Sequence, residues 1–154
     1  MSLTRLTASQ KRATLEAVLW LLGSMLLIKL VPFRYWSRFL GVKMAVDSLE
    51  ETPHCPDLSR EVSQTIRRVN RIFRGRFTCL MQAVAGKAML NRRGIPNTLV
   101  LGARTIRGNN GELKMEAHAW LKCGSSILLG GEAHARFTAV AQFHSPAPPV
   151  PRQS

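Results

Sequence analysis

Arg76-Phe77-Thr78-Cys79-Leu80 is the stretch on which the predicted fold depends, because it indicates a helix that begins at a cysteine. Thr78 is an acceptable N-cap residue, and apolar side chains follow it at helical spacing. The run ends at Asn91-Arg92-Arg93-Gly94, with basic residues in the last turn and a glycine after it. We therefore expect Cys79 in the first turn of a helix.

A cysteine in this position is a candidate nucleophile. A free thiol has a pKa of about 8.5, and both a helix N-terminus and a neighbouring imidazole lower that value. The first turn of a helix also offers backbone N–H groups that can hold an oxyanion. The alternative is that Cys79 is a small buried apolar side chain among Leu, Met and Ala residues.

The base for such a nucleophile is expected in Ala117-His118-Ala119-Trp120. Residues 113–122 alternate in part between apolar and polar side chains, and the turn residues Gly108-Asn109-Asn110-Gly111 precede them. This pattern predicts one strand of an antiparallel hairpin, with His118 beside Trp120 on its less apolar face. A lone histidine is often a structural residue, but a cysteine on a helix followed by a histidine on a strand favours a catalytic pair.

The blocks around these two residues form a longer pattern. In chain order they are Leu15-Glu16-Ala17 through Leu30-Val31-Pro32-Phe33-Arg34, Cys79-Leu80, Arg93-Gly94-Ile95-Pro96, Leu99-Val100-Leu101-Gly102 and Ala117-His118-Ala119-Trp120-Leu121. The pattern resembles the B2 proteins of lasso-peptide biosynthesis, which are transglutaminase-like cysteine peptidases that remove the leader from a precursor peptide. The resemblance covers roughly residues 10–140, and the interval from cysteine to histidine suits that family.

The resemblance implies an α+β fold, in which N-terminal helices precede a small antiparallel sheet packed on the Cys79 helix, as in transglutaminase-like and papain-like cysteine proteases. It implies that Cys79 attacks a peptide carbonyl and that His118 serves as general base and then general acid. No cofactor and no metal are expected. The implied partners are the precursor peptide, a small leader-recognition protein called B1 and the lasso cyclase.

At the place of the third catalytic residue, the sequence departs from the family's pattern. The family carries an acidic residue, usually Asp, on the strand after the histidine, whereas Gly130 and Gly131 stand near that place here. Glu132 is the only later carboxylate, and it would orient His118 if its loop folds back. Alternatively, Glu132 is a solvated loop residue and a backbone carbonyl orients the imidazole, or the enzyme is weakened or inactive.

Composition limits the number of domains and the kinds of partner that the protein can have. The 154 residues suit one domain, and 45% of them are apolar, which is enough for a core. With 22 Lys and Arg against 9 Asp and Glu, the formal charge of +13 favours an acidic peptide, an acidic protein, a membrane surface or nucleic acid. A transglutaminase-like acyltransferase and a non-enzymatic basic adaptor for membrane or nucleic acid stay open as alternative functions. For the peptidase, nucleic acid is not expected as a partner.

Cysteine usage favours reduced thiols and a cytoplasmic location. The three cysteines, Cys55, Cys79 and Cys123, are an odd number without C-x-x-C spacing, which argues against a disulfide framework and a zinc site. His54 and Cys55 are interpreted as incidental loop residues. Alternation places Cys123 on the opposite strand face from His118, so it ranks below Cys79 as a nucleophile.

The N-terminal part, residues 1–44, is expected to be helical. Residues 17–28 are almost wholly apolar, but this uncharged run is shorter than the about 20 residues needed to span a bilayer. We expect a buried or partner-binding helix, with membrane-surface attachment through Trp20, Tyr35 and Trp36 as the alternative. Pro32 should break the helix before a second short helix that ends at Gly41.

The rest of the chain is divided into a loop at 45–57, a transglutaminase-like core at 58–144 and a disordered Pro-rich tail at 145–154. Asp57 should cap a helix whose apolar stripe is Val62, Ile66, Val69 and Phe73. Its basic residues, Arg67, Arg68, Arg71 and Arg74, form either a solvated face or a docking surface for an acidic leader or partner. Strands are predicted at 97–103, 113–122, 126–129 and 136–140.

Overall fold

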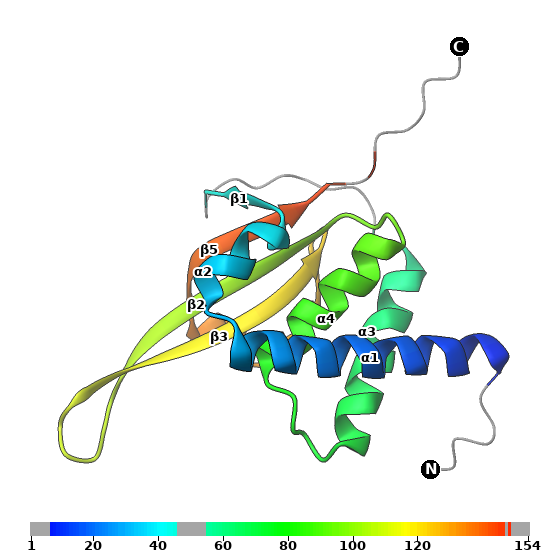
Figure 1. The fold of residues 1–154 in the computed structure, drawn as a ribbon. Coiled ribbons are helices and arrows are strands. Elements are labelled where there is room, and N and C mark those ends of the chain that lie inside the picture. The colour runs from blue at the N-terminus through cyan, green and yellow to red at the C-terminus, as the bar shows by residue number, and fades with distance from the viewer. Residues whose placement is uncertain (1–6, 46–54, 147, 149–154) are drawn as a thin grey trace.

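The computed structural model describes residues 7–45, 55–146 and 148, and it shows an α+β fold. Helices pack against one antiparallel sheet (Figure 1). The elements are α1 (Ala8–Leu30), α2 (Phe33–Trp36), the 3-10 turn η2 (Ser37–Leu40), β1 (Val42–Met44), α3 (Asp57–Ile72), α4 (Cys79–Arg92), β2 (Asn97–Arg107), β3 (Leu113–Cys123), β4 (Ser126–Leu129), the 3-10 turn η3 (His134–Arg136) and β5 (Thr138–Ser145).

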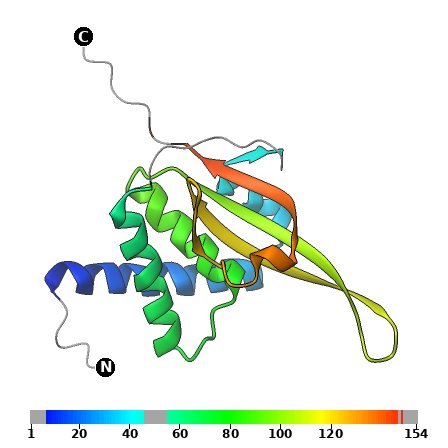
Figure 2. The ribbon, with the colours of Figure 1, turned by 180° about the vertical axis from the view of Figure 1, so that it is seen from behind.

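The sheet has five strands in the order β1-β5-β2-β3-β4, and all neighbours are antiparallel. The β2–β3 hairpin runs in unbroken register from the pair Thr98↔Lys122 to the pair Arg107↔Leu113. Its outer half reaches beyond the body of the protein (Figures 1 and 2). The predicted hairpin is confirmed, and β2 continues past the expected end at residue 103 because it stays paired with β3 to the turn.

Helix α4 lies at the centre of the fold, between the sheet and α1. Met89 and Leu90 are fully buried in the same core as Leu99 and Leu121 of the sheet. Gly86 lets the sheet approach the helix, because a Cβ at this position would collide with the side chains of Leu121 and Leu129. The core therefore fixes α4 firmly beneath the strands.

One charged side chain, Lys87, is buried in this core. Its Nζ donates to Oδ1 of Asn97 and to the carbonyl of Phe143, each at 3.1 Å. Burial without a carboxylate partner lowers the pKa of Lys87 to about 7. Both acceptors lie on the sheet, so the ammonium group links α4 to β2 and β5.

Helix α1 crosses α3 and α4 on their outer side (Figure 1). Its buried residues are Ala17, Leu21 and Ser24, and the Ser24 hydroxyl donates to the carbonyl of Met81 at 3.1 Å. A bidentate pair between Glu16 and Arg93 adds contacts of 3.1 and 2.7 Å. Arg93 donates both hydrogen bonds, and they are the main cause that lowers the pKa of Glu16. The helix is therefore attached to the domain along one narrow face.

The outer face of α1 carries exposed apolar side chains. Its exposed leucines are Leu15, Leu19, Leu26 and Leu30. By length and composition α1 qualifies as a candidate membrane span, which the apolar run at 17–28 did not suggest. Trp36, considered as an interfacial anchor, is instead buried and donates from Nε1 to the carbonyl of Val31 at 3.1 Å.

Several predicted boundaries are wrong in detail. β5 begins at Thr138 and extends to Ser145, so residue 145 is not part of a tail, and Arg136 belongs to η3. The short edge strand β1 was missed because three residues carry no readable periodicity. Asp57 is the first helical residue of α3 instead of its cap, which is Pro56. Residues 46–54, with His54, and most of the expected tail lie outside the described residues.

The expectation of three reduced thiols is also wrong. Cys55, just before α3, and Cys123, at the end of β3, form a disulfide with a Cα–Cα distance of 5.5 Å. The two residues are separated by 68 positions in the chain, so only the fold reveals that they meet. Of the three cysteines, all within the described residues, only Cys79 is free.

Candidate active site

Cys79 is the first residue of α4, as predicted. The Thr78 side chain caps the helix by accepting a hydrogen bond from the Met81 N–H at 3.4 Å, and the Thr78 carbonyl accepts from the Gln82 N–H at 3.0 Å. The N–H groups of the first turn beside the thiol, those of Cys79 and Leu80, have no intrahelical acceptor in a helix of this geometry. They are therefore suited to stabilise negative charge that develops next to the sulfur.

The segment before Cys79 is held in place by side chains of two helices. The buried Phe77 donates its N–H to Oδ1 of Asn70 on α3 at 3.1 Å, and its carbonyl accepts from Nε2 of Gln82 on α4 at 2.9 Å. These two hydrogen bonds satisfy both backbone polar groups of Phe77 and connect the segment before the thiol to α3 and α4. Sequence reasoning missed Asn70 and Gln82; the only available signal was that Gln82 lies one turn after Cys79.

His118 lies on β3 with its ring between two aromatic side chains. The ring stacks on Phe137 with a centroid distance of 5.0 Å and on Trp120 with a distance of 6.0 Å. Its Nε2 lies 2.8 Å from the carbonyl oxygen of Gly130. A carbonyl only accepts hydrogen bonds, so this contact requires the proton on Nε2 and leaves Nδ1 of the neutral ring with its lone pair.

Gly130 places its carbonyl against His118 through a backbone conformation that needs glycine. Its φ is +74°, and a Cβ would collide with the carbonyl oxygen of Ala119 and with Trp120. The carbonyl therefore takes the position beside the imidazole at which the resemblance implied an acidic residue. Of the alternatives left open by the sequence, the structure shows a backbone carbonyl, that of Gly130, bound to the imidazole of His118.

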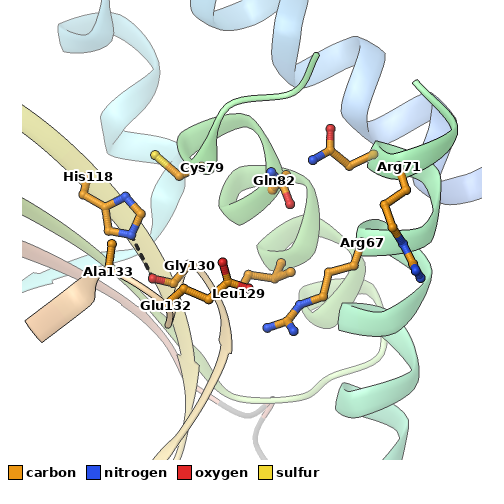
Figure 3. Close-up of a pocket in the computed structure, with 10 residues that line it drawn as sticks. Arg67, Arg71, Cys79, Gln82, His118, Leu129, Gly130, Glu132 and Ala133 are labelled. Atoms are coloured by element: carbon orange, nitrogen blue, oxygen red, sulfur yellow. Dashed lines mark hydrogen bonds between the residues drawn. The ribbon is translucent and has the colours of Figure 1, made fainter. Parts of the chain in front are cut away.

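Cys79 and His118 line one pocket of about 570 Å³ between α3, α4, β3 and the loop after β4. Figure 3 shows them at the same end of the pocket, with Nδ1 of the imidazole on the side of the thiol. Arg67 and Arg71 of α3 lie at the opposite end. The predicted nucleophile and the predicted base are therefore brought together, although they come from distant parts of the chain.

Glu132 also lines this pocket, in the loop that follows β4. It is exposed, and the hydrogen bond made by Nε2 of His118 goes to Gly130. The orienting role that we expected for Glu132 stays a prediction. Cys123 is removed as a rival nucleophile because its sulfur is in the disulfide with Cys55. Among the described residues, no group of three or more His, Cys, Asp or Glu side chains is arranged to hold a metal ion.

The family model of the transglutaminase-like superfamily matches residues 27–142, which is most of the chain and includes the whole pocket. The protein therefore belongs to the transglutaminase-like superfamily. This superfamily includes cysteine peptidases and acyltransferases and usually relies on cysteine-based catalysis. Searches of curated proteins and of solved structures returned no match.

Proposed function

We propose that this member of the transglutaminase-like superfamily is a cysteine peptidase that removes the leader peptide from a ribosomally made lasso-peptide precursor. The observation that carries the proposal is the shared pocket of Cys79 and His118, in which the Gly130 carbonyl binds Nε2 of the imidazole and Nδ1 lies on the side of the thiol. Membership of this superfamily, which usually relies on cysteine-based catalysis, supports the proposal. The leader as substrate rests on the sequence resemblance described above.

The reaction follows from the positions of these groups. Nδ1 of His118 takes the thiol proton as the sulfur of Cys79 bonds to the scissile carbonyl carbon, and the carbonyl oxygen becomes an oxyanion near the first turn of α4. The imidazolium then gives its proton to the leaving amine, and the peptide C–N bond breaks to leave a thioester. Water, deprotonated by His118, attacks the thioester, which releases the acid and restores the thiol.

An acyltransferase is the alternative within the same fold. The thioester would then be attacked by an amine instead of water, and none of the described residues that line the pocket discriminates against an amine. A non-enzymatic basic adaptor for membrane or nucleic acid is a second alternative. It predicts strongly salt-dependent binding to lipid or DNA and no selective reaction of Cys79 with thiol reagents.

We propose three partners for the peptidase: the precursor peptide, a separate B1 protein that recognises the leader, and the cyclase that closes the ring. The apolar face of α1 supports a protein contact, because Leu19 and Leu26 are 62% and 54% exposed on a helix that otherwise packs on the domain. Contact of this face with a membrane surface is the alternative proposal. We propose a cytoplasmic location, where the ribosomally made precursor is released; the Cys55–Cys123 disulfide is the one observation that favours an oxidising compartment instead.

The test is leader cleavage by the purified chain with B1 and the cognate precursor, followed by mass spectrometry. Cys79→Ala should abolish cleavage, because the variant has no sulfur to form the thioester. Unchanged thermal unfolding of the variant controls for its fold. If Cys79→Ala cuts as fast as the parent, the nucleophile is assigned wrongly. A product joined to an added amine, in place of the free acid, would support the acyltransferase.

A further inference from the structure

The wall of the pocket opposite Cys79 is basic. Arg67 and Arg71 lie four residues apart on α3, so they share one face of the helix, and both line the pocket. Figure 3 shows Arg67 reaching from α3 toward the pocket and Arg71 running along the helix. The only carboxylate among the pocket residues is Glu132. Two guanidinium groups against one carboxylate give this end of the pocket a positive potential.

Neither arginine is paired with an acidic side chain of the described residues. Within the described part of the chain, neither guanidinium lies within 4.0 Å of a carboxylate. Arg67 donates from one terminal nitrogen to the carbonyl of Leu128 at 2.9 Å, which fixes the side chain beside the pocket and leaves its other N–H groups available. Arg71 is exposed at the rim. Such a pair presents planar donors that match a carboxylate.

We propose that Arg67 and Arg71 form a subsite that binds an acidic side chain of the peptide substrate, close to the bond that Cys79 attacks. The inference rests on the proposed function and adds the class of residue that the pocket prefers. The peptide carbonyl lies at the thiol end of the pocket, and the Asp or Glu side chain reaches across to α3. Arg67, which is held by Leu128, sets the position of the carboxylate, and Arg71 closes over it from the rim.

The neighbouring Arg68 supplies a matched control. It lies on the same helix but lines a different pocket, between α1 and α3, together with Glu16 and Glu61. Replacing Arg68 or Arg71 by Gln removes the same charge from the same helix, and only Arg71 borders the catalytic pocket. An effect of the net charge of +13 alone would be equal for the two variants.

The test compares the alkylation rates of Cys79 by iodoacetate and iodoacetamide, two reagents of similar size of which only the first carries a carboxylate. Cys79 is the free cysteine, so the modified site is unambiguous by mass spectrometry. We expect Arg71→Gln to lower the iodoacetate-to-iodoacetamide rate ratio by about threefold or more at low salt, and Arg71→Glu to lower it further. Arg68→Gln should leave the ratio unchanged, and 1 M salt should reduce the difference between the parent and the variants.

Each outcome separates the subsite from the proposed function. A ratio that is the same in the parent, Arg71→Gln and Arg68→Gln overturns the subsite, even if iodoacetamide reacts rapidly with Cys79. If iodoacetamide alkylates Cys79 slowly and His118→Ala does not slow this reaction further, the catalytic pair is overturned, whatever the rate ratio shows. Because Arg71 is exposed and makes no hydrogen bond to the sheet, its variants keep the test valid if Arg67→Gln does not fold.

Discussion

Helices α1 and α4 are both apolar in sequence, yet the fold uses them in opposite ways. α4 is covered on two sides, and its small residues Ala83, Ala85 and Gly86 are buried where the sheet and the other helices approach. α1 buries a narrow face and turns large leucines outward. Apolar content alone therefore does not distinguish a central helix from a surface helix; the distribution of small and large side chains around the helix does.

The difference matters for the site because α4 carries the nucleophile. A helix that is packed on both sides holds Cys79 in one position relative to His118, which reaction geometry requires. α1 meets α4 through the Glu16–Arg93 pair and a few buried side chains, so a change on its outer face has no direct path to the thiol. If α4 supports the active site and the outer face of α1 is a contact surface, substitutions in the two helices should differ in their effects on stability and on binding.

The largest expected effect on stability comes from one substitution made in both helices. Leu90→Ala in α4 removes a fully buried side chain and should lower the free energy of unfolding by about 3 kcal/mol. Leu26→Ala in α1 removes a side chain that is 54% exposed and should change it by less than about 0.5 kcal/mol. Urea unfolding followed by circular dichroism measures both. Equal losses would contradict the contrast between the helices.

A smaller effect should follow pH through Lys87 of α4. Because burial lowers its pKa to about 7, the unfolded chain binds a proton that the folded protein lacks between pH 7 and the ordinary value of 10.5. The free energy of unfolding should therefore rise with pH across this window by about 1 kcal/mol per pH unit, and this gain is lost again as pH falls from 10.5 to 7.

The Lys87→Met variant isolates this contribution, because all other titrating groups are shared. The difference in unfolding free energy between the parent and the variant, measured from pH 7 to 9, should grow in favour of the parent. A difference that stays constant with pH would show that the ammonium group is not desolvated in the folded protein.

The smallest effect on stability, with the largest effect on association, is expected on the outer face of α1. A Leu19→Gln, Leu26→Gln double variant should unfold within about 0.5 kcal/mol of the parent, since both side chains are exposed. It should nevertheless lose binding to B1 in size-exclusion chromatography. Retained B1 binding with lost flotation on anionic vesicles would assign the face to a membrane surface instead.

Local signals made part of this architecture predictable. Thr78 before an apolar run marks the start of α4, and the Asn110-Gly111 turn between two β-rich segments marks the hairpin. Cys79 and His118 could be singled out because each lies in such a local pattern. Their meeting in one pocket was an inference from the family resemblance, since residue spacing carries no information about distance in the fold.

The features that escaped prediction all depend on long-range contacts. The disulfide joins Cys55 and Cys123, which are 68 positions apart in the chain, and β1 is a strand because it pairs with β5. A backbone carbonyl was one of the alternatives for orienting His118, but no side-chain pattern identifies Gly130 as the residue that supplies it. The basic face of α3 was visible in the sequence, but whether it faces solvent or the thiol depended on how the helix rotates onto the sheet.

The protruding end of the β2–β3 hairpin has a practical consequence. Its turn, with Gly111 at φ +79°, is exposed and lies seven residues along β3 from His118, or about 20 Å in an extended strand. Surface loop tips of this kind are the preferred places for inserted segments. An epitope tag or a biotin acceptor placed between Asn109 and Asn110 would immobilise the protein with its pocket and α1 both open to solution, in an orientation suited to capturing the precursor and its helper proteins.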